Sequence, residues 1–244
     1  MLMKLIVRGH HALNVRLFDC GAYLRRYREL VDNALRGPGY VLHLGSGDAV
    51  TLSRAHELSH PESTFICVDL DLQALRANPA RMKVVADAAA LPFKSGSIGA
   101  ICSEHLLEHL SDPQGVFRES QRVLRAGGRF IFAAPNGWSY IALVTRMVPL
   151  RFRATLVQFA THGTSRHQHF PTYYRANSAV AVQRLARRSG LSVERLEGFV
   201  GEPCYTLSLP LIHILAIAWH KLLELCGLRR VLGITLVGSL EKRE

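Results

Sequence analysis

The chain has 244 residues, of which 48% are hydrophobic, and carries a net charge of +11. That length and apolar content are enough for one substantial core, so we expect a single domain. The five cysteines are odd in number, widely spaced and without a C-x-x-C pair, which argues against a disulfide framework or a zinc knuckle and favours a cytoplasmic protein.

The excess charge lies in one part of the chain. No Asp or Glu occurs between Ser120 and Val193, whereas 11 arginines do, and the remaining 19 basic residues balance the 19 acidic ones. This segment suggests an anionic partner, which could be nucleic acid, an acidic membrane surface or a phosphorylated substrate. A solvated basic face is the alternative.

The first half of the chain alternates helices and strands. The N-terminal stretch is interrupted by Arg8, His10 and His11 before an apolar core of signal length develops, so no secretion signal is expected. The patterns predict a leading helix at 19–35 and strands at 40–44, 64–68, 83–86, 98–102 and 129–134. Between the strands they predict helices at 48–58, 71–77, 105–110 and 112–124, the last capped by residues 126–128. Such alternation predicts a parallel sheet with helices on both faces and ligands at the carboxyl ends of the strands.

The alternation pauses after residue 136 and then resumes. We expect a helical stretch at 138–160, a loop at 161–171, a helix at 177–189 with Gly190 as its C-cap, a strand at 192–198, an apolar helical stretch at 205–225 and a strand at 233–240. The predicted domain spans 1–244. Its parts are a leading helical segment (1–36), a cofactor-binding half (37–137), a lid or substrate segment (138–171) and a C-terminal half (172–244) with an apolar helical insertion at 203–228.

Three features follow the first three strands directly. These are the turn Gly45-Ser46-Gly47, then Asp69, then Asp87. Glycines let a backbone approach a ligand closely, and an acid about 20 residues further on is the usual partner of ribose hydroxyls. A dinucleotide is disfavoured, because Val50 replaces the third glycine of that motif and Asp48 would meet the diphosphate. A nucleoside cofactor without phosphate fits better.

Three runs in this half resemble class I S-adenosylmethionine-dependent methyltransferases, specifically the small-molecule group with a D-x-x-x-LPF pattern. They are DAAALPF at 87–93, SIGAICSEHLLEHL at 97–110 and RVLRAGGR at 122–129. The resemblance is strong over about 36–137 and extends further only in layout. It implies an α/β, Rossmann-like fold with a seven-stranded, mostly parallel sheet, helices on both faces, an antiparallel last strand and, in this chain, a helical lid insertion.

The resemblance also implies S-adenosyl-L-methionine as the cofactor and a role for each matching residue. Gly45, Ser46 and Gly47 would face the methionine part, Asp69 with its neighbour Leu70 the ribose, Asp87 and Ala88 the adenine, and Ser103 the methionine end. Two positions depart from the pattern. His43 replaces an acid that usually helps to hold the amino-acid end, and Ala49 replaces a glycine. A cofactor-binding scaffold without turnover is therefore an alternative.

Methyl transfer from a sulfonium requires in-line alignment and no metal, and a hydroxyl acceptor also requires a base. Histidine is the usual base near neutral pH, and His105 follows the fourth strand. His167 or His169 would enter from the lid, whereas His109 belongs to the Leu-Glu-His run of the family and is interpreted as architectural. A zinc site at His162, His167 and His169 is the alternative, but their spacing matches no closed structural site and no cysteine accompanies them.

Two apolar segments bear on the acceptor. Residues 138–153 mix aromatic, aliphatic and arginine residues as interfacial segments do, and residues 203–220 contain no charged Asp, Glu, Lys or Arg. A buried lid helix or a dimer contact competes with docking on an anionic membrane. We expect O-methylation, rather than C- or N-methylation, of an apolar, lipid-linked or glycan-linked small molecule, by a monomer or homodimer that is cytoplasmic or peripheral at the inner face of the membrane. A nucleic-acid methyltransferase that uses residues 120–193 is the second hypothesis.

Overall fold

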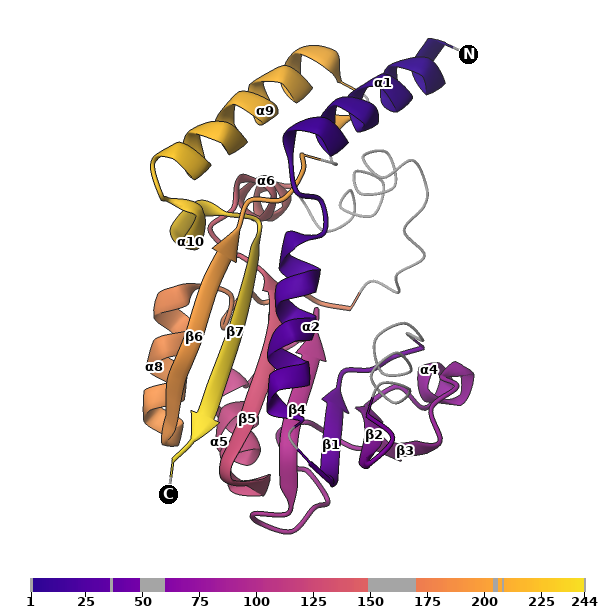
Figure 1. Cartoon of the computed structure of the whole chain (residues 1–244), viewed down its shortest axis with the longest axis vertical. Helices are drawn as coiled ribbons and strands as arrows, with labels where there is room; N and C mark the ends of the chain where they lie inside the picture. Colours follow the sequence, from indigo (N-terminus) through magenta and orange to yellow (C-terminus); the bar gives the residue numbers. More distant parts are fainter. Residues whose placement is uncertain are drawn as a thin grey trace.

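The computed structural model describes residues 2–35, 37–48, 60–148, 170–203, 206–207 and 209–243. A seven-stranded sheet with the order β3-β2-β1-β4-β5-β7-β6 runs through the molecule (Figure 1). The strands are β1 Gly39–Leu44, β2 Ser63–Asp69, β3 Met82–Val85, β4 Ile98–Glu104, β5 Leu124–Pro135, β6 Leu191–Phe199 and β7 Thr235–Lys242. The α-helices are α1 Leu2–Leu17, α2 Ala22–Ala34, α4 Leu72–Ala77, α5 Pro113–Val123, α6 Tyr140–Met147, α8 Ala179–Ser189, α9 Pro210–Leu225 and α10 Arg229–Leu232, and η1 Leu107–His109 is a 3₁₀ turn.

The sheet confirms the predicted fold class. Strands β3, β2, β1, β4 and β5 are mutually parallel, whereas β7 pairs antiparallel with both β5 and β6. The chain leaves β1 for β2 on one side and reaches β4 on the other, so the strand order reverses at β1. Ligands of open α/β sheets bind at the carboxyl ends of the strands beside such a reversal.

The two faces of the sheet are covered by different helices. Tyr27 and Val31 of α2 pack with Val41 of β1 on one face. Leu42, the next residue of β1, lies in the cluster with α5 and α8 on the other face, because successive side chains of a strand point to opposite sides. Both faces of the central strands are therefore buried, which is why these strands have continuous apolar sequences.

Three details of the helices differ from the sequence-based expectations. Helix α1 lies within the expected leading helical segment (1–36) but ahead of the helix predicted at 19–35, and it packs against α9. Helix α9 begins at Pro210 rather than at residue 205, since proline suits the first turn of a helix. The third difference is at 126–128, which does not cap α5. Strand β5 already begins at Leu124, which pairs with Ile98, and Gly127 lies inside that strand at a φ of +72°.

Several predicted segments lie outside the described residues. They are the helix at 48–58 from residue 49 on, the stretch 149–160 after α6, and all of the predicted loop up to residue 169. Among the described residues, no helix is both long and apolar enough to cross a bilayer.

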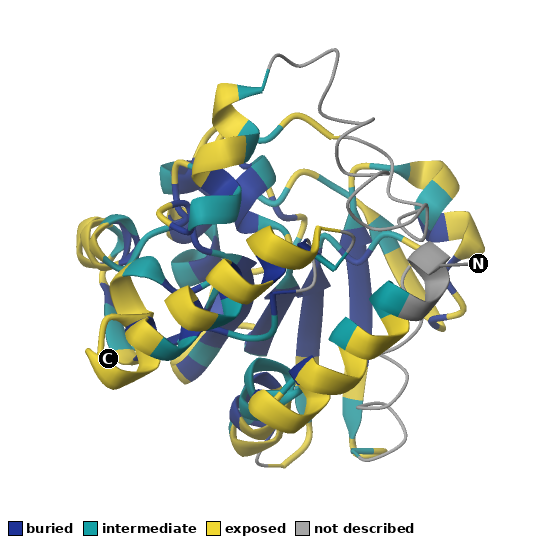
Figure 2. Ribbon diagram, turned by 90° about the horizontal axis from the view of Figure 1, so that it is seen from above, coloured by how far each residue is buried: buried dark blue, intermediate teal, exposed yellow. Residues whose placement is uncertain are grey.

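Helices α1 and α9 lie beyond the end of the sheet toward which β4 and β5 point (Figure 1). From above, the strands are dark blue, whereas the helices in front of them carry long exposed stretches (Figure 2). We refer to α1, α9 and α10 together as the cap. The strand ends where ligands are expected and the cap thus lie toward the same end of the molecule.

Candidate functional site

The turn after β1 needs glycine. The amides of Gly45 and Ser46 both donate to the Val68 carbonyl, at 2.9 and 3.3 Å, so the chain stays bonded to β2 just beyond the end of β1. Gly45 has a φ of +67°, and a Cβ atom there would lie 2.9 Å from Cδ1 of Leu106. Any other residue at position 45 would be strained by its backbone conformation and would collide with the loop after β4.

Asp69 closes this turn onto β2. Its Oδ2 accepts a hydrogen bond from the Gly47 amide at 2.7 Å, and its Oδ1 accepts one from the Asp71 amide at 2.9 Å. A carboxylate has about four acceptor positions, so these bonds leave Asp69 free to accept from a ligand as well. The carboxylate therefore holds the glycine turn and keeps acceptor capacity at the strand end.

Asn78 is a site residue that the sequence reasoning missed. Its Nδ2 donates to the Gly47 carbonyl at 2.9 Å, while its Oδ1 accepts from the Ala80 amide at 3.0 Å. In the sequence, Asn78-Pro79 signals only the end of a helix. The contact spans 31 positions, so no local pattern could have indicated that the end of α4 also clamps the glycine turn.

The residues expected to face the nucleoside lie at the neighbouring strand ends. The Ala86 amide donates to the Asp69 carbonyl at 3.1 Å, which continues the pairing of β3 with β2 and brings the following residue, Asp87, alongside. Asp87 Oδ1 accepts from the Ala89 amide at 2.8 Å, and Ala88 packs against the core. Leu70 is largely exposed. The structure thus groups Asp69, Leu70, Asp87 and Ala88 at one edge.

Two hydroxyl groups at this end of the sheet have no partner among the described residues. Ser46 and Ser103 are buried, and neither Oγ makes a hydrogen bond. Ser46 lies just after the end of β1, and Ser103 lies at the end of β4. These two strands are adjacent in the sheet. A buried unpaired hydroxyl costs about 1–3 kcal/mol, and a ligand with hydrogen-bonding groups would remove that cost. The residues present therefore fit a cofactor that has polar groups at one end and a nucleoside at the other.

His43 is buried within β1. It lies two residues after Val41 and so points to the face covered by α2, with Cys67 and Cys102 as its register neighbours. Burial raises the pKa of the Cys102 thiol to about 12, so that thiol stays protonated at neutral pH.

His105 stands directly after β4 with a left-handed φ of +53°. Its amide donates to the Ala133 carbonyl at 2.9 Å, and its Nδ1 lies 3.4 Å from Oε1 of the buried Glu108. Hydrogen bonding to Glu108 is the largest cause that raises the pKa of His105, and burial opposes it. The side chain is 61% exposed, so the imidazole can meet a ligand from solvent.

Glu108 also connects the site to the chain that follows residue 169. Its carbonyl accepts from the amides of Tyr173 and Tyr174 at 2.7 and 3.2 Å. Its Oε1 is 3.9 Å from Nε2 of His109, whose Nδ1 bonds to the Pro171 carbonyl at 2.9 Å. The guanidinium of Arg146 stacks 4.8 Å from the ring centre of Tyr174. The structure therefore brings α6 and residues 170–175 to the loop after β4, while His162, His167 and His169 lie outside the described residues.

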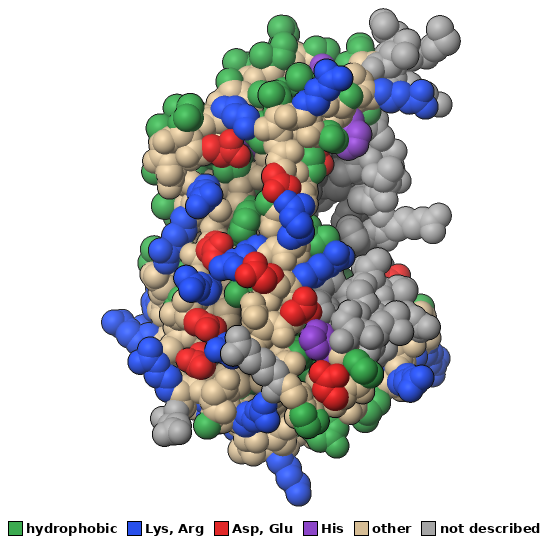
Figure 3. All heavy atoms as spheres, in the orientation of Figure 1, with side chains coloured by type: hydrophobic (Ala, Val, Ile, Leu, Met, Phe, Trp, Pro, Cys, Tyr) green, Lys and Arg blue, Asp and Glu red, His purple; other side chains and the backbone are tan. Residues whose placement is uncertain are grey.

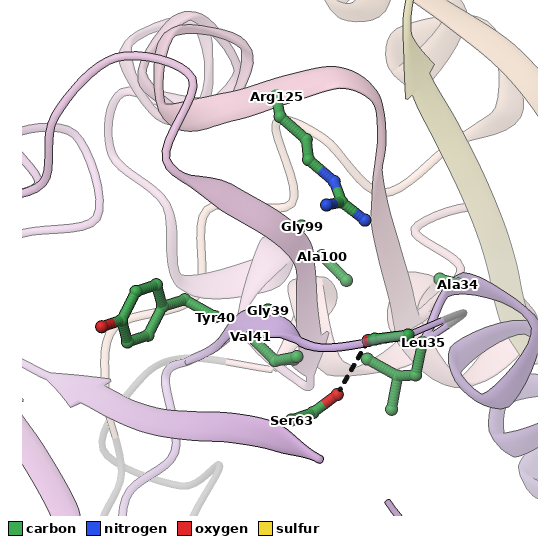
Figure 4. Close-up of a pocket in the computed structure, with 10 residues that line it drawn as sticks. Ala34, Leu35, Gly39, Tyr40, Val41, Ser63, Gly99, Ala100 and Arg125 are labelled. Carbon is green, nitrogen blue, oxygen red and sulfur yellow. Dashed lines mark hydrogen bonds between the residues drawn. The ribbon is translucent and has the colours of Figure 1, made fainter.

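A small cavity of about 10 Å³ lies at the opposite end of the sheet. Figure 4 shows that the amino ends of β1, β2 and β4 line it, with Arg125 extending over Gly99. That volume holds about one water molecule, so the cavity has no bearing on a nucleoside site. Within the described part of the chain, no group of three or more His, Cys, Asp or Glu side chains is arranged to hold a metal ion.

The comparisons with known proteins agree with this geometry. Residues 42–132 match the family model described as a methyltransferase domain. Demethylmenaquinone methyltransferase from Mycobacterium tuberculosis is 35% identical over 119 residues, which are 46% of this chain and 50% of that protein. An uncharacterised 37.1 kDa protein of a Streptomyces fradiae transposon is 30% identical over 128 residues, 49% of this chain and 37% of that protein. The matched stretch thus spans half or less of these relatives.

Solved structures share the fold across most of the chain. Geranyl diphosphate C-methyltransferase from Streptomyces coelicolor, with S-adenosyl-L-homocysteine bound, superposes with a TM-score of 0.58 at 15% identity and covers 89% of this chain and 80% of its own. A phosphoethanolamine N-methyltransferase from Haemonchus contortus gives a TM-score of 0.58 at 14% identity and covers 91% of this chain and 52% of its own. One fold carries both C- and N-methylating enzymes, so it leaves the acceptor atom open.

Proposed function

We propose that this chain, whose residues 42–132 match the methyltransferase-domain family model, is a class I S-adenosylmethionine-dependent enzyme that transfers the cofactor's methyl group to an apolar small molecule. The observation that carries the proposal is the glycine turn closed onto Asp69 beside the unpartnered hydroxyls of Ser46 and Ser103. At one edge of the sheet, these features supply a backbone turn that a ligand can approach closely, a carboxylate that can accept hydrogen bonds from ribose hydroxyls, and two unpaired hydroxyl groups.

Each group has a role in holding S-adenosylmethionine. Gly45, Ser46, Gly47 and Ser103 would hold its methionine part, Asp69 and Leu70 its ribose, and Asp87 and Ala88 its adenine. When bound, the cofactor supplies a methyl group on a sulfonium. The remaining task of the protein is to align an acceptor and to accept its proton, and alignment alone can contribute ~7 kcal/mol or more.

His105 is the base in this proposal. Its Nδ1 faces Glu108, so a proton on Nδ1 would be shared with the carboxylate and would leave the lone pair on Nε2 to accept a proton from the acceptor. Glu108 is a positioning residue because it acts through His105. His167 and His169 are candidates for a second group that enters from the lid segment. A hydroxyl acceptor, which needs a base, is consistent with this arrangement.

Two observations support an apolar acceptor. Two of the similar proteins act, by their names, on demethylmenaquinone and on geranyl diphosphate, both of which carry isoprenoid carbon chains, whereas a third is named for phosphoethanolamine. In this chain, Trp138, Val144 and Met147 of α6 and its flank are exposed. Helix α6 is linked to the loop that carries His105 through Tyr174, which contacts Arg146 and bonds to Glu108. We therefore place the acceptor among apolar or lipid-linked molecules, and the enzyme at the inner face of a membrane.

The test has two stages. Calorimetry with S-adenosylhomocysteine should show binding. No binding at millimolar ligand would contradict both the small-molecule and the nucleic-acid methyltransferase hypotheses. Transfer of tritiated methyl groups into the lipid, RNA and small-molecule fractions of a lysate should then label an apolar fraction. Label in RNA would instead assign a nucleic-acid methyltransferase, and binding without any label would assign a scaffold.

His105→Ala should lower the rate of transfer by roughly 100-fold or more, since a general base contributes about that much, and should leave the affinity for S-adenosylhomocysteine unchanged. His109→Ala is the matched control, because it removes the other imidazole that lies near Glu108. An equal loss in both variants would contradict the role assigned to His105.

A further inference from the structure

The inner face of helix α9 carries two buried histidines beside Ala216 and Leu223, whereas its outer face carries large apolar side chains. His213 and His220 are both 0% exposed, whereas Leu211, Leu215 and Leu225 are 79%, 69% and 86% exposed. A surface helix of a water-soluble protein normally shows the reverse, with its apolar stripe on the core. The outer face of α9 therefore suits contact with an apolar medium.

The inner histidines are held by specific contacts. The ring of His10 in α1 stacks on His213 with centres 4.4 Å apart, and His213 Nδ1 lies 2.9 Å from the hydroxyl oxygen of Thr206. His220 Nδ1 bonds to the Gly201 carbonyl at 3.1 Å. These contacts fix the rotation of α9 about its axis, so the exposure of its leucines follows from the packing of its histidines.

The outer apolar residues form a continuous stripe. At 100° per residue they fall within about 160° of the helix circumference, and no charged side chain lies among them. They are Leu211, Ile212, Ile214, Leu215, Trp219, Leu222 and Leu225. Leu228 and Val231, around α10, continue the exposed surface past the end of the helix. Contiguous apolar surface of this kind marks an interaction site rather than scattered surface residues.

Charge identifies the kind of partner. The cap helices contain six basic residues, which are Lys4, Arg8, Arg16, Lys221, Arg229 and Arg230, and a single acidic one, Glu224, so their net charge is 6 − 1 = +5. Figure 3 shows hydrophobic side chains gathered over this end of the molecule with Lys and Arg side chains beside them, and further Lys and Arg side chains spread over the rest of this face. A second copy of the chain would bring a cap of the same sign against the first, whereas an anionic bilayer offers both a hydrophobic interior and the opposite charge.

We propose that the outer face of α9, with α10 and the basic residues of the cap, docks on the surface of an anionic lipid bilayer. This rests on the proposed function in one respect, which is that docking would give the site access to an acceptor that partitions into membranes. The apolar stripe inserts among the acyl chains at the headgroup boundary, and Arg229 and Arg230 at its end meet lipid phosphates. In this proposal α9 lies along the bilayer surface and does not cross the bilayer.

The test is co-sedimentation of the full chain with vesicles, without cofactor or acceptor. We expect binding to vesicles of phosphatidylcholine mixed with phosphatidylglycerol and little binding to phosphatidylcholine alone. Leu215→Ser with Leu222→Ser should weaken binding by about tenfold or more, because both side chains are exposed and lose apolar contact with lipid rather than with the core. Arg229→Glu with Arg230→Glu should weaken it by about tenfold or more at low salt, since each cation near the surface contributes several-fold.

Matched controls lie on α8, away from the cap. Val180→Ser removes an exposed apolar side chain, and Arg187→Glu with Arg188→Glu makes the same change in net charge, so both variants should bind like the unmodified chain. Equal binding to both kinds of vesicle, or no binding to either, would overturn the proposal. So would a dimer in lipid-free solution that the leucine pair dissolves, which would assign the stripe to a second copy.

The outcomes separate docking from the proposed function. Vesicle binding without binding of S-adenosylhomocysteine contradicts the proposed function alone. Cofactor binding and methyl transfer without vesicle binding contradict the docking surface alone.

Discussion

Polar side chains are arranged in opposite ways at the strand ends and in the cap. At the strand ends, Asp69 and Asn78 each bond to the backbone of the glycine turn, and buried hydroxyls remain free for a ligand. In the cap, His213 and His220 are buried while leucines of the same helix face outward. The strand ends therefore suit a polar ligand, whereas the outer face of α9 suits an apolar environment outside the protein.

The cap also holds buried polar atoms for which no ligand is proposed. Both side-chain polar atoms of Asn14, and Nε2 of His213 and of His220, are buried without a partner among the described residues. Each such atom costs about 1–3 kcal/mol. At the strand ends, the unpaired hydroxyls of Ser46 and Ser103 lie where the cofactor is proposed to bind. The comparison therefore predicts that changes at the strand ends affect cofactor binding and that changes in the cap affect docking and stability.

The largest effect is expected for Gly45→Ala. Positive φ strain and the collision with Leu106 each cost ~1–3 kcal/mol, so binding of S-adenosylhomocysteine in calorimetry should weaken by roughly 100-fold. Vesicle docking should not change. Gly127→Ala is the control, since Gly127 has a φ of +72° but nothing within 4 Å of its added Cβ. Similar losses of affinity in both variants would show that backbone strain, and not the site, is responsible.

A smaller effect is expected for Asp69→Asn. The amide group would have to turn an N–H toward the amide of Gly47 or of Asp71, so one of two charge-assisted bonds is lost and the turn loosens. Cofactor affinity should fall by roughly tenfold. Asp71→Asn keeps a good N-cap on α4 and should bind normally in the same titration. Unchanged affinity in Asp69→Asn would remove Asp69 from the site.

Glu108→Gln should shift the pH dependence of methyl transfer. Hydrogen bonding to Glu108 raises the pKa of His105, and a base works only when it is deprotonated, so the rate rises with pH as His105 loses its proton. Removing the carboxylate lowers that pKa and moves the acidic limb of the pH–rate profile to lower pH. Glu104→Gln should cause a smaller shift of the same sign, because the charge of Glu104 raises the pKa of His105 less than Glu108 does. An unmoved limb in both variants would exclude His105 as the titrating base.

The smallest effect is expected from acidification of the cap. Burial is the largest cause that lowers the pKa of His213 and of His220, so their contribution to stability is complete above the unfolded histidine value of about 6.5 and is lost as the pH falls toward the folded values. The melting temperature should therefore fall by a few degrees between pH 8 and pH 5. Replacing both histidines with Gln should flatten that dependence in thermal unfolding, and a dependence that persists would have to come from other groups.

Much of the first half was predictable from local patterns. The strands β1 to β5 were expected within a few residues, because apolar runs bounded by Gly, Pro and Asp reflect burial on both faces of a parallel sheet. The grouping of Gly45, Asp69 and Asp87 followed from the same alternation, since parallel strands bring their carboxyl ends together. The start of β5 was missed because the pairing of Leu124 with Ile98, and not any local signal, draws the chain into the sheet.

The sequence by itself determined the order of the elements, the parallel sheet and the edge at which the site residues gather, because periodicity and turn residues act over a few positions. Only the tertiary structure decided that Asn78 bonds to a turn 31 positions away, that Glu108 is buried beside His105, and which way α9 faces. The reason is clearest in α9. Apolar residues occur on more than one side of this helix, so its own periodicity does not choose an inner face, and the stacking of His213 on His10 of α1 makes that choice.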